Sequence, residues 1–116
     1  MPVYSIHEHE LNPAADPQAY EAAVQEAIAR LRVPGLLAAQ HLKGFKGERS
    51  GRYAVLWIFE NAEAIRRNFG TPDAPIWPPD WLHYENEVLA PFLDRHPDTV
   101  DFTDYAILQG FDFPQA

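Results

Sequence analysis

The sequence predicts an α+β domain with a four-stranded antiparallel sheet, and the order of its elements carries this prediction. Segments typical of strands and segments with helical spacing follow one another as strand, helix, strand, strand, helix, strand. A βαββαβ chain with right-handed crossovers folds most simply as one antiparallel sheet with its helices on one side, the ferredoxin-like arrangement. The 116 residues are enough for one domain, 1–116, and too few for two ordinary ones.

The first strand and the first helix can be read in turn from the start of the chain. Residues 3–11 alternate as a strand does, although several of the polar positions are histidine or glutamate. Asp16 followed by Pro17 is typical of an N-cap and a first helical residue. Apolar residues then recur every three or four positions as far as Leu31, which predicts an amphipathic helix that stops at Pro34.

Two further strands follow, and the second of them has no polar face. Residues 36–45 and 53–59 are predicted as strands joined by a glycine-containing hairpin over 46–51. Alternation gives the strand 53–59 two apolar faces: Tyr53, Val55, Trp57 and Phe59 on one, and Ala54, Leu56 and Ile58 on the other. One face can pack under the helices. The other needs a different cover, which a second copy of the chain would supply.

The second half of the chain is less regular. Asn61 is predicted to cap a short helix, and a proline-rich insertion follows over about 70–80. Asp80 is predicted to cap a further helix, in which Pro91 should cause a kink or a break. Residues 100–109 form the expected fourth strand.

The composition excludes several classes of function. A net charge of −8 argues against nucleic acid or an anionic membrane as a partner, because both favour clustered Lys and Arg. Without cysteine there is no disulfide framework, no thiolate nucleophile and no sulfur-ligated metal. The start of the chain does not resemble a signal peptide and no segment has membrane-spanning length, so we expect a cytoplasmic protein.

Two motifs carry a resemblance to a known family. They are Pro34-Gly35-Leu36-Leu37 and the run from Tyr53 to Ile65, Tyr-Ala-Val-Leu-Trp-Ile-Phe-Glu-Asn-Ala-Glu-Ala-Ile. Both resemble the antibiotic biosynthesis monooxygenase (ABM-like) branch of the dimeric α/β-barrel superfamily. The element order agrees over most of the chain, while the motifs cover about a quarter of it.

The resemblance implies a homodimer joined through the second face of the sheet, with a pocket for a small molecule in each subunit. Activities in this superfamily include cofactor-independent oxygenation of quinol-like substrates, haem degradation, and isomerase or signal-processing roles. The oxygenases and haem-degrading members generally carry an asparagine on the first strand. This chain has His7 and His9 there instead, and its nearest asparagine, Asn12, follows the strand.

His7 and His9 are the candidate catalytic residues. They share one face of the first strand with Ser5, and a histidine can act as a general base near neutral pH. The alternative is that they hydrogen-bond across a solvated half of the strand. An H-x-H pair can also chelate a metal, but no third ligand is evident, so we predict no metal site.

His41 and His83 are secondary candidates. His41 would face the same cavity as Trp57 or lie at the surface of the sheet edge. His83 and Glu87 form an i,i+4 helical pair, which is usually a surface contact. In the haem-binding relatives a helical histidine is the axial ligand, so His83 is the position to test for haem, although we predict no cofactor.

Four aromatic residues complete the predicted site. Trp57 and Phe59 are expected to line the pocket or fill the barrel, and Tyr105 to orient a phenolic or enolic substrate or to join two subunits. Trp77, between prolines of the insertion, would close over a ligand or dock on the partner subunit.

Two hypotheses follow. The first is a cofactor-independent monooxygenase acting on an aromatic or enolic substrate, with His7 or His9 as the base. The second is a non-catalytic binding or dimerisation module in which the same aromatic residues fill the barrel. A haem-binding or haem-degrading protein is a distant third possibility.

Overall fold

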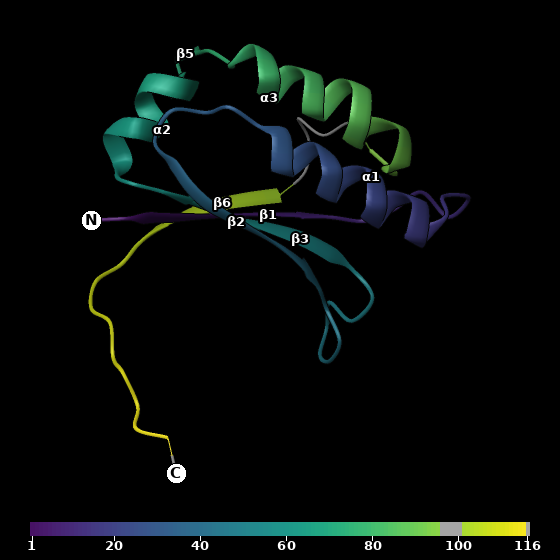
Figure 1. Ribbon diagram of the computed structural model, residues 1–116, viewed down its shortest axis with the longest axis horizontal. Coiled ribbons are helices and arrows are strands. Elements are labelled where there is room, and N and C mark those ends of the chain that lie inside the picture. The colour runs from purple at the N-terminus through teal and green to yellow at the C-terminus, as the bar shows by residue number, and fades with distance from the viewer. Residues whose placement is uncertain (96–100, 116) are drawn as a thin grey trace.

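A computed structural model describes residues 1–95 and 101–115. It is built on one four-stranded antiparallel sheet in the order β2-β3-β1-β6, whose helices all cover the same face (Figure 1). The strands are β1 (Val3–His9), β2 (Leu36–Lys43), β3 (Tyr53–Phe59) and β6 (Asp101–Ala106). The predicted ferredoxin-like α+β fold is therefore confirmed. Residue 100 of the expected fourth strand lies outside the described residues.

The first two helices begin where the sequence indicates. Helix α1 (Pro17–Arg30) has Asp16 at its N-cap, and the Asp16 side chain accepts a hydrogen bond from the Gln18 N–H at 3.3 Å. Helix α2 (Ala62–Phe69) is capped by Asn61, whose side chain accepts from the Ala64 N–H at 2.8 Å. These polar side chains supply partners to backbone N–H groups that the first turn of a helix leaves unpaired.

The two resemblance motifs meet in space, which explains their residue types. Gly35 has φ of +83°, and a Cβ there would lie 2.6 Å from the Cβ of Ala64, which is fully buried in α2. The Gly35 carbonyl also accepts from the Glu60 N–H at 2.9 Å. The turn before β2 can therefore lie against the start of α2 only if position 35 has no side chain.

The last helical region differs from the prediction at its start. Helix α3 (Pro79–His83) has Pro78 at its N-cap position and no side-chain capping hydrogen bond. The predicted cap by Asp80 is wrong, because the Asp80 carboxylate instead accepts from the backbone N–H of Arg32 at 3.2 Å. It therefore ties the end of α1 to the start of α3.

The break predicted at Pro91 is confirmed. After α3 the chain continues as a π-helix, η1 (Tyr84–Leu89), and then as a 3-10 turn, η2 (Ala90–Phe92). Proline has no N–H to donate to the carbonyl four residues earlier, so regular α-helical hydrogen bonding cannot pass through this position.

The insertion folds as a small hairpin of β4 (Gly70–Thr71) and β5 (Ala74–Pro75). Gly70 ends α2 with φ of +73°, and a Cβ there would lie 2.2 Å from the carbonyl oxygen of Ala74. The Ile76 N–H donates to the Phe69 carbonyl at 3.0 Å and closes the hairpin onto the end of α2.

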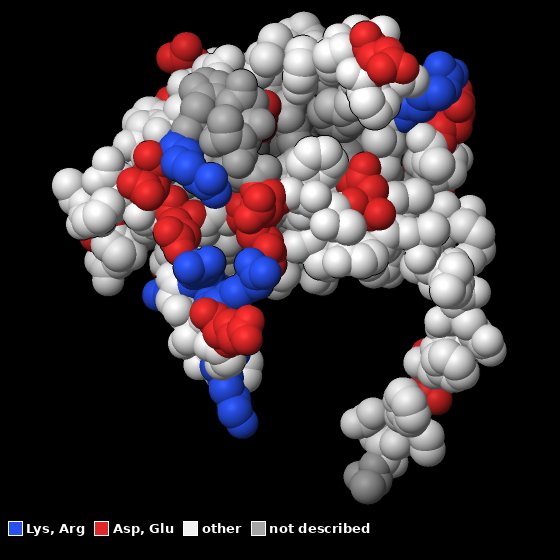
Figure 2. All heavy atoms as spheres, turned by 180° about the vertical axis from the view of Figure 1, so that it is seen from behind, with Lys and Arg blue, Asp and Glu red and all other residues white. Residues whose placement is uncertain are grey.

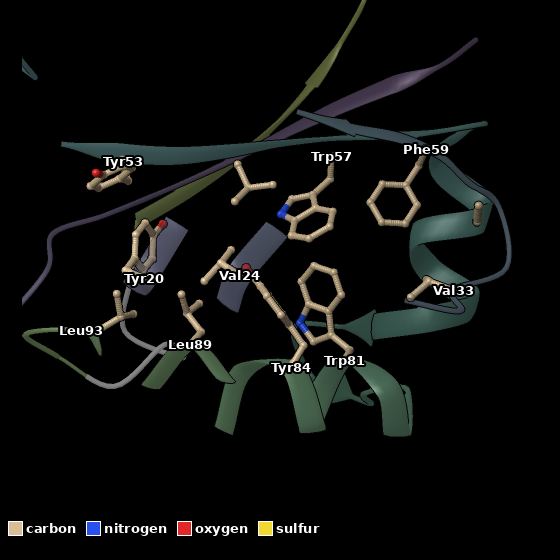
Figure 3. Packing of buried hydrophobic residues seen from close by; sticks show 12 residues of the cluster. Tyr20, Val24, Val33, Tyr53, Trp57, Phe59, Trp81, Tyr84, Leu89 and Leu93 are labelled. Carbon is tan, nitrogen blue, oxygen red and sulfur yellow. The ribbon is translucent and has the colours of Figure 1, made fainter. Parts of the chain in front are cut away.

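The core lies between the sheet and the helices, and Figure 3 shows its packing. Tyr53, Val55, Trp57 and Phe59 of β3 all face the helices and are buried. Ala54, Leu56 and Ile58 are half-buried on the opposite face. This decides which of the two apolar faces the helices cover. No helix of the described residues is long and apolar enough to cross a membrane.

Candidate functional site

A pocket of about 410 Å³ lies between the sheet and the helices, at the end of the core next to the β4–β5 hairpin. Strands β1, β3 and β6 supply its floor, and α2, the hairpin, α3 and η1 supply its walls. Most of the lining is apolar, including Phe59, Phe69, Trp77, Trp81 and Phe102, and the polar residues are Ser5, His7, Thr71, Glu85 and Asp104. An apolar cleft with a small number of convergent polar groups is the usual form of a small-molecule site.

His7 is the titratable group at the centre of this pocket. Its ring lies edge-on to Trp81 at a centroid distance of 5.9 Å and tilted over Phe102 at 5.3 Å. Its Nε2 is 3.1 Å from the Ser5 hydroxyl. Burial lowers the pKa of His7 to about 4, and the nearby Asp104 carboxylate acts in the opposite direction. The imidazole is therefore neutral at pH 7, with one nitrogen free to accept a proton.

Asp104 and Phe102 belong to the pocket although sequence reasoning did not select them. Strand β6 pairs antiparallel with β1, so Phe102 lies opposite His7 and Asp104 opposite Ser5. The sequence does indicate, from their spacing of two residues, that Phe102 and Asp104 share one face of a strand. The register that brings them to His7 depends on strand pairing, which alternation within one strand does not give.

His9 lies two residues further along the same face of β1, next to Tyr20. Its side chain is buried, and its Nε2 is hydrogen-bonded to the Tyr20 hydroxyl. The same hydroxyl lies 2.8 Å from the Nε2 of His41. Burial lowers the pKa of His9 to about 4, with smaller contributions from His41 and His7. The pocket beside His7 does not include His9.

The hydrogen bonds around Tyr20 assign the protons of both histidines. The Gln25 side-chain amide lies 3.3 Å from Nδ1 of His41, and an amide NH2 can only donate. Nδ1 therefore accepts, and the Nε2–H of His41 donates to the Tyr20 oxygen. The Tyr20 O–H is then left to donate to Nε2 of His9, whose own proton sits on Nδ1.

His41 was expected either in the same cavity as Trp57 or at the surface of the sheet edge. It lies on the face of the sheet that the helices cover, next to Tyr20 and away from the His7 pocket. It is half-buried, and burial lowers its pKa while Glu21 raises it. The structure brings His41 together with His9 rather than with the pocket.

Trp57 and Phe59 occupy the core beside the pocket. The Phe59 ring lines the pocket directly. Trp57 is 1% exposed and supports the wall from behind, with its ring 4.7 Å from that of Trp81. Its indole nitrogen has no hydrogen-bond partner within the described residues and lies on the side of the ring away from Phe59 (Figure 3).

The remaining predicted residues lie in three different places. Trp77 is 47% exposed and forms part of the pocket wall, where the insertion meets α3. His83 is exposed in a surface groove between α1 and the last helical region. Tyr105 pairs with Tyr4 on the face of the sheet that the helices leave open, so the structure does not bring it to Trp57.

In residues 1–95 and 101–115, no three His, Cys, Asp or Glu side chains lie close enough together to hold a metal ion.

Comparisons with known proteins identify the fold. No family model and no curated protein matches the sequence. Among solved structures, a dimeric ferredoxin-like protein of unknown function from Bacteroides fragilis superposes with a TM-score of 0.62 at 14% identity, over 91% of this chain and 96% of the other. SnoaB, a cofactor-independent oxygenase from Streptomyces nogalater, gives 0.60 at 15% identity, over 94% and 95% of the two chains.

A candidate antibiotic biosynthesis monooxygenase from Bordetella bronchiseptica gives a TM-score of 0.65 at 12% identity, over 93% of this chain and 98% of the other. The likeness to all three is one of fold. It agrees with the ABM-like resemblance of the two sequence motifs.

Proposed function

We propose that the chain is a homodimeric small-molecule-binding protein that oxygenates an aromatic or enolic substrate without a cofactor. The observation that carries this proposal is a neutral imidazole, His7, facing an aromatic-walled pocket between the sheet and the helices. A planar aromatic ligand would pack against the rings of Phe69, Trp81 and Phe102. SnoaB, which shares the fold, is a cofactor-independent oxygenase, and this supports the choice of chemistry.

In the proposed reaction His7 removes a proton from an activated CH2 group of the substrate. The Asp104 carboxylate stabilises the imidazolium that forms, because it favours the charged state of His7. The carbanion gives its electrons to O2 and forms a peroxide. Loss of water from this peroxide turns the CH2 into a carbonyl, so one oxygen atom enters the product and the other leaves as water. His7 returns its proton to the departing hydroxide.

Oxygen consumption with a panel of anthrones and dihydroxynaphthalenes tests the reaction. We expect one O2 consumed per carbonyl formed, and a loss of about 100-fold or more in His7→Ala. His83→Ala is the matched control, because it removes an exposed histidine away from the pocket. Unchanged turnover in His7→Ala would reject His7 as the base. Binding without turnover in the unaltered protein would favour the non-catalytic module instead.

The homodimer is proposed to form through the open face of the sheet. This face presents a run of apolar side chains from all four strands: Tyr4, Ile6, Leu42, Ala54, Leu56, Ile58 and Tyr105. Charged residues gather instead over the β2–β3 hairpin, where Arg49 pairs with Glu8 at 2.8 Å and Arg52 with Glu10 at 2.5 Å (Figure 2). Each Å² of apolar surface that the dimer removes from water stabilises it by about 25 cal/mol.

The chain after β6 supports the same interface. It leaves the sheet on the side opposite the helices (Figure 1) and carries Leu108, Phe111 and Phe113, which are 96%, 71% and 80% exposed. Three large apolar side chains with no cover in one copy are consistent with contact on a second copy. The dimeric ferredoxin-like proteins from Bacteroides fragilis and Thermobifida fusca share the fold.

Sedimentation velocity tests the interface. We expect a dimer for the unaltered chain and dissociation in Ile58→Glu, which places a charge on the apolar open face. Ala29→Glu on the exposed side of α1 is the control and should stay dimeric. A monomeric unaltered protein, or an Ile58→Glu protein that remains a dimer, would overturn this interface.

A further inference from the structure

The charged residues that the structure describes in the lining of the His7 pocket are acidic. Two carboxylates, Asp104 and Glu85, line it, and no Lys or Arg of the described residues does. The nearest basic residues along the chain, Arg66 and Arg67 of α2, form ion pairs with Glu63 and Glu60. His7 adds no positive charge at neutral pH, because burial lowers its pKa to about 4. An anion entering the pocket would therefore meet the Asp104 carboxylate, and no Lys or Arg in the described part of the lining.

The pocket wall also offers the faces of several aromatic rings. Trp77 and Phe102 are 47% and 64% exposed, so part of each ring is available to a ligand. Trp81 lies between Phe69 and His7, with ring centroids 5.0 and 5.9 Å away. The negative face of an aromatic ring attracts an ammonium group, and indole does so most strongly. The rings and the carboxylates thus favour the same kind of ligand.

We propose that the His7 pocket selects aromatic ligands that carry a positive charge, such as a protonated amine or a quaternary ammonium, and rejects their carboxylated analogues. The cationic group would lie next to Asp104, and the ring system would pack among Phe69, Trp81 and Phe102. This inference rests on the proposed function, since it takes from it that the pocket binds an aromatic small molecule.

Calorimetric titration with three ligands of the same ring system tests the selectivity. The ligands are 2-naphthylmethylammonium, the neutral 2-naphthylmethanol and the anionic 2-naphthoate, each at low and at high salt. At low salt we expect the ammonium to bind about tenfold more tightly than the alcohol, and the carboxylate to bind more weakly than either. High salt should shrink both differences, because Asp104 is exposed to solvent.

Two variants locate the charge that is responsible. Asp104→Asn should lower the ratio of ammonium to alcohol affinity severalfold. Glu26→Gln removes the same charge from α1, where Glu26 pairs with Arg30 at 2.9 Å, and should leave the ratio unchanged. An equal fall of the ratio in both variants would show a general effect of net charge and overturn the assignment to Asp104.

The two proposals fail in different ways. If the alcohol binds but the ligand charge makes no difference, or if the carboxylate binds most tightly, charge selection is overturned and the aromatic pocket stands. If none of the three ligands binds, the proposed function is overturned together with the inference that depends on it.

Discussion

His7 and His9 lie on the same face of β1, and burial lowers the pKa of each to about 4, yet their surroundings differ completely. His9 is 7% exposed and bonded to Tyr20, which His41 contacts from the other side, and it borders a different cavity beside the β2–β3 hairpin. Among the described residues the His7 side chain has one hydrogen bond, to Ser5, and it faces a pocket. A buried polar group must be paired to avoid a large cost, whereas a group that works on a ligand needs room beside it. We infer from its paired side chain that His9 stabilises the fold, and we propose His7 rather than His9 as the base.

The largest expected effect is on stability at the His9 end. His9→Ala leaves a cavity and removes the acceptor of the Tyr20 hydroxyl, so we expect a loss of about 2–3 kcal/mol in the free energy of unfolding. His7→Ala should cost about 1 kcal/mol or less, because its side chain borders open space. Urea denaturation at one fixed protein concentration measures both, and equal losses would contradict the comparison.

A second effect concerns pH. Each histidine has a folded pKa near 4, below its usual value near 6.5, so the unfolded chain binds more protons between these pH values. The free energy of unfolding should therefore fall as the pH drops from about 6.5 towards 4, by about 2–3 kcal/mol per histidine. Replacing either histidine by Gln should remove part of this fall. A curve that is the same in the unaltered protein and both Gln variants would argue against neutral buried histidines.

A third effect isolates the hydrogen bonds of Tyr20. Tyr20→Phe keeps the ring and removes the hydroxyl between His9 and His41, with an expected cost of about 1 kcal/mol. In a His9→Ala background the same change should cost less, because one of the two bonds is already lost. Additive costs in the double variant would show that the hydroxyl and His9 act independently.

The smallest effect on stability belongs to the pocket wall. Trp77→Ala should change the free energy of unfolding by about 0.5 kcal/mol or less, because Trp77 is 47% exposed. It should lower the affinity for an aromatic ligand by about threefold to tenfold, measured by calorimetry. Phe45→Ala on the β2–β3 hairpin, an aromatic residue that is 92% exposed, serves as control and should leave the affinity unchanged.

The sequence by itself determined the order of the main elements and where most of them begin. Asp16 and Asn61 cap helices because their short side chains accept from the backbone of the next turn, an interaction that is local in the chain. The break at Pro91 is local for the same reason. Asp80 was wrongly predicted to cap a helix. Its carboxylate instead accepts a hydrogen bond from the backbone N–H of Arg32, 48 positions away. A contact of that kind leaves no local pattern.

Only the tertiary structure decided which residues form the site. Alternation placed His7 and His9 on one face of β1. The pairing of β1 with β6 completes the pocket beside His7, and the position of α1 brings Tyr20 into contact with His9. The same pairing brought Phe102 and Asp104 to His7 and placed Tyr105 on the opposite face. Register and helix packing are set by contacts between distant parts of the chain, and a period of two within one strand cannot specify them.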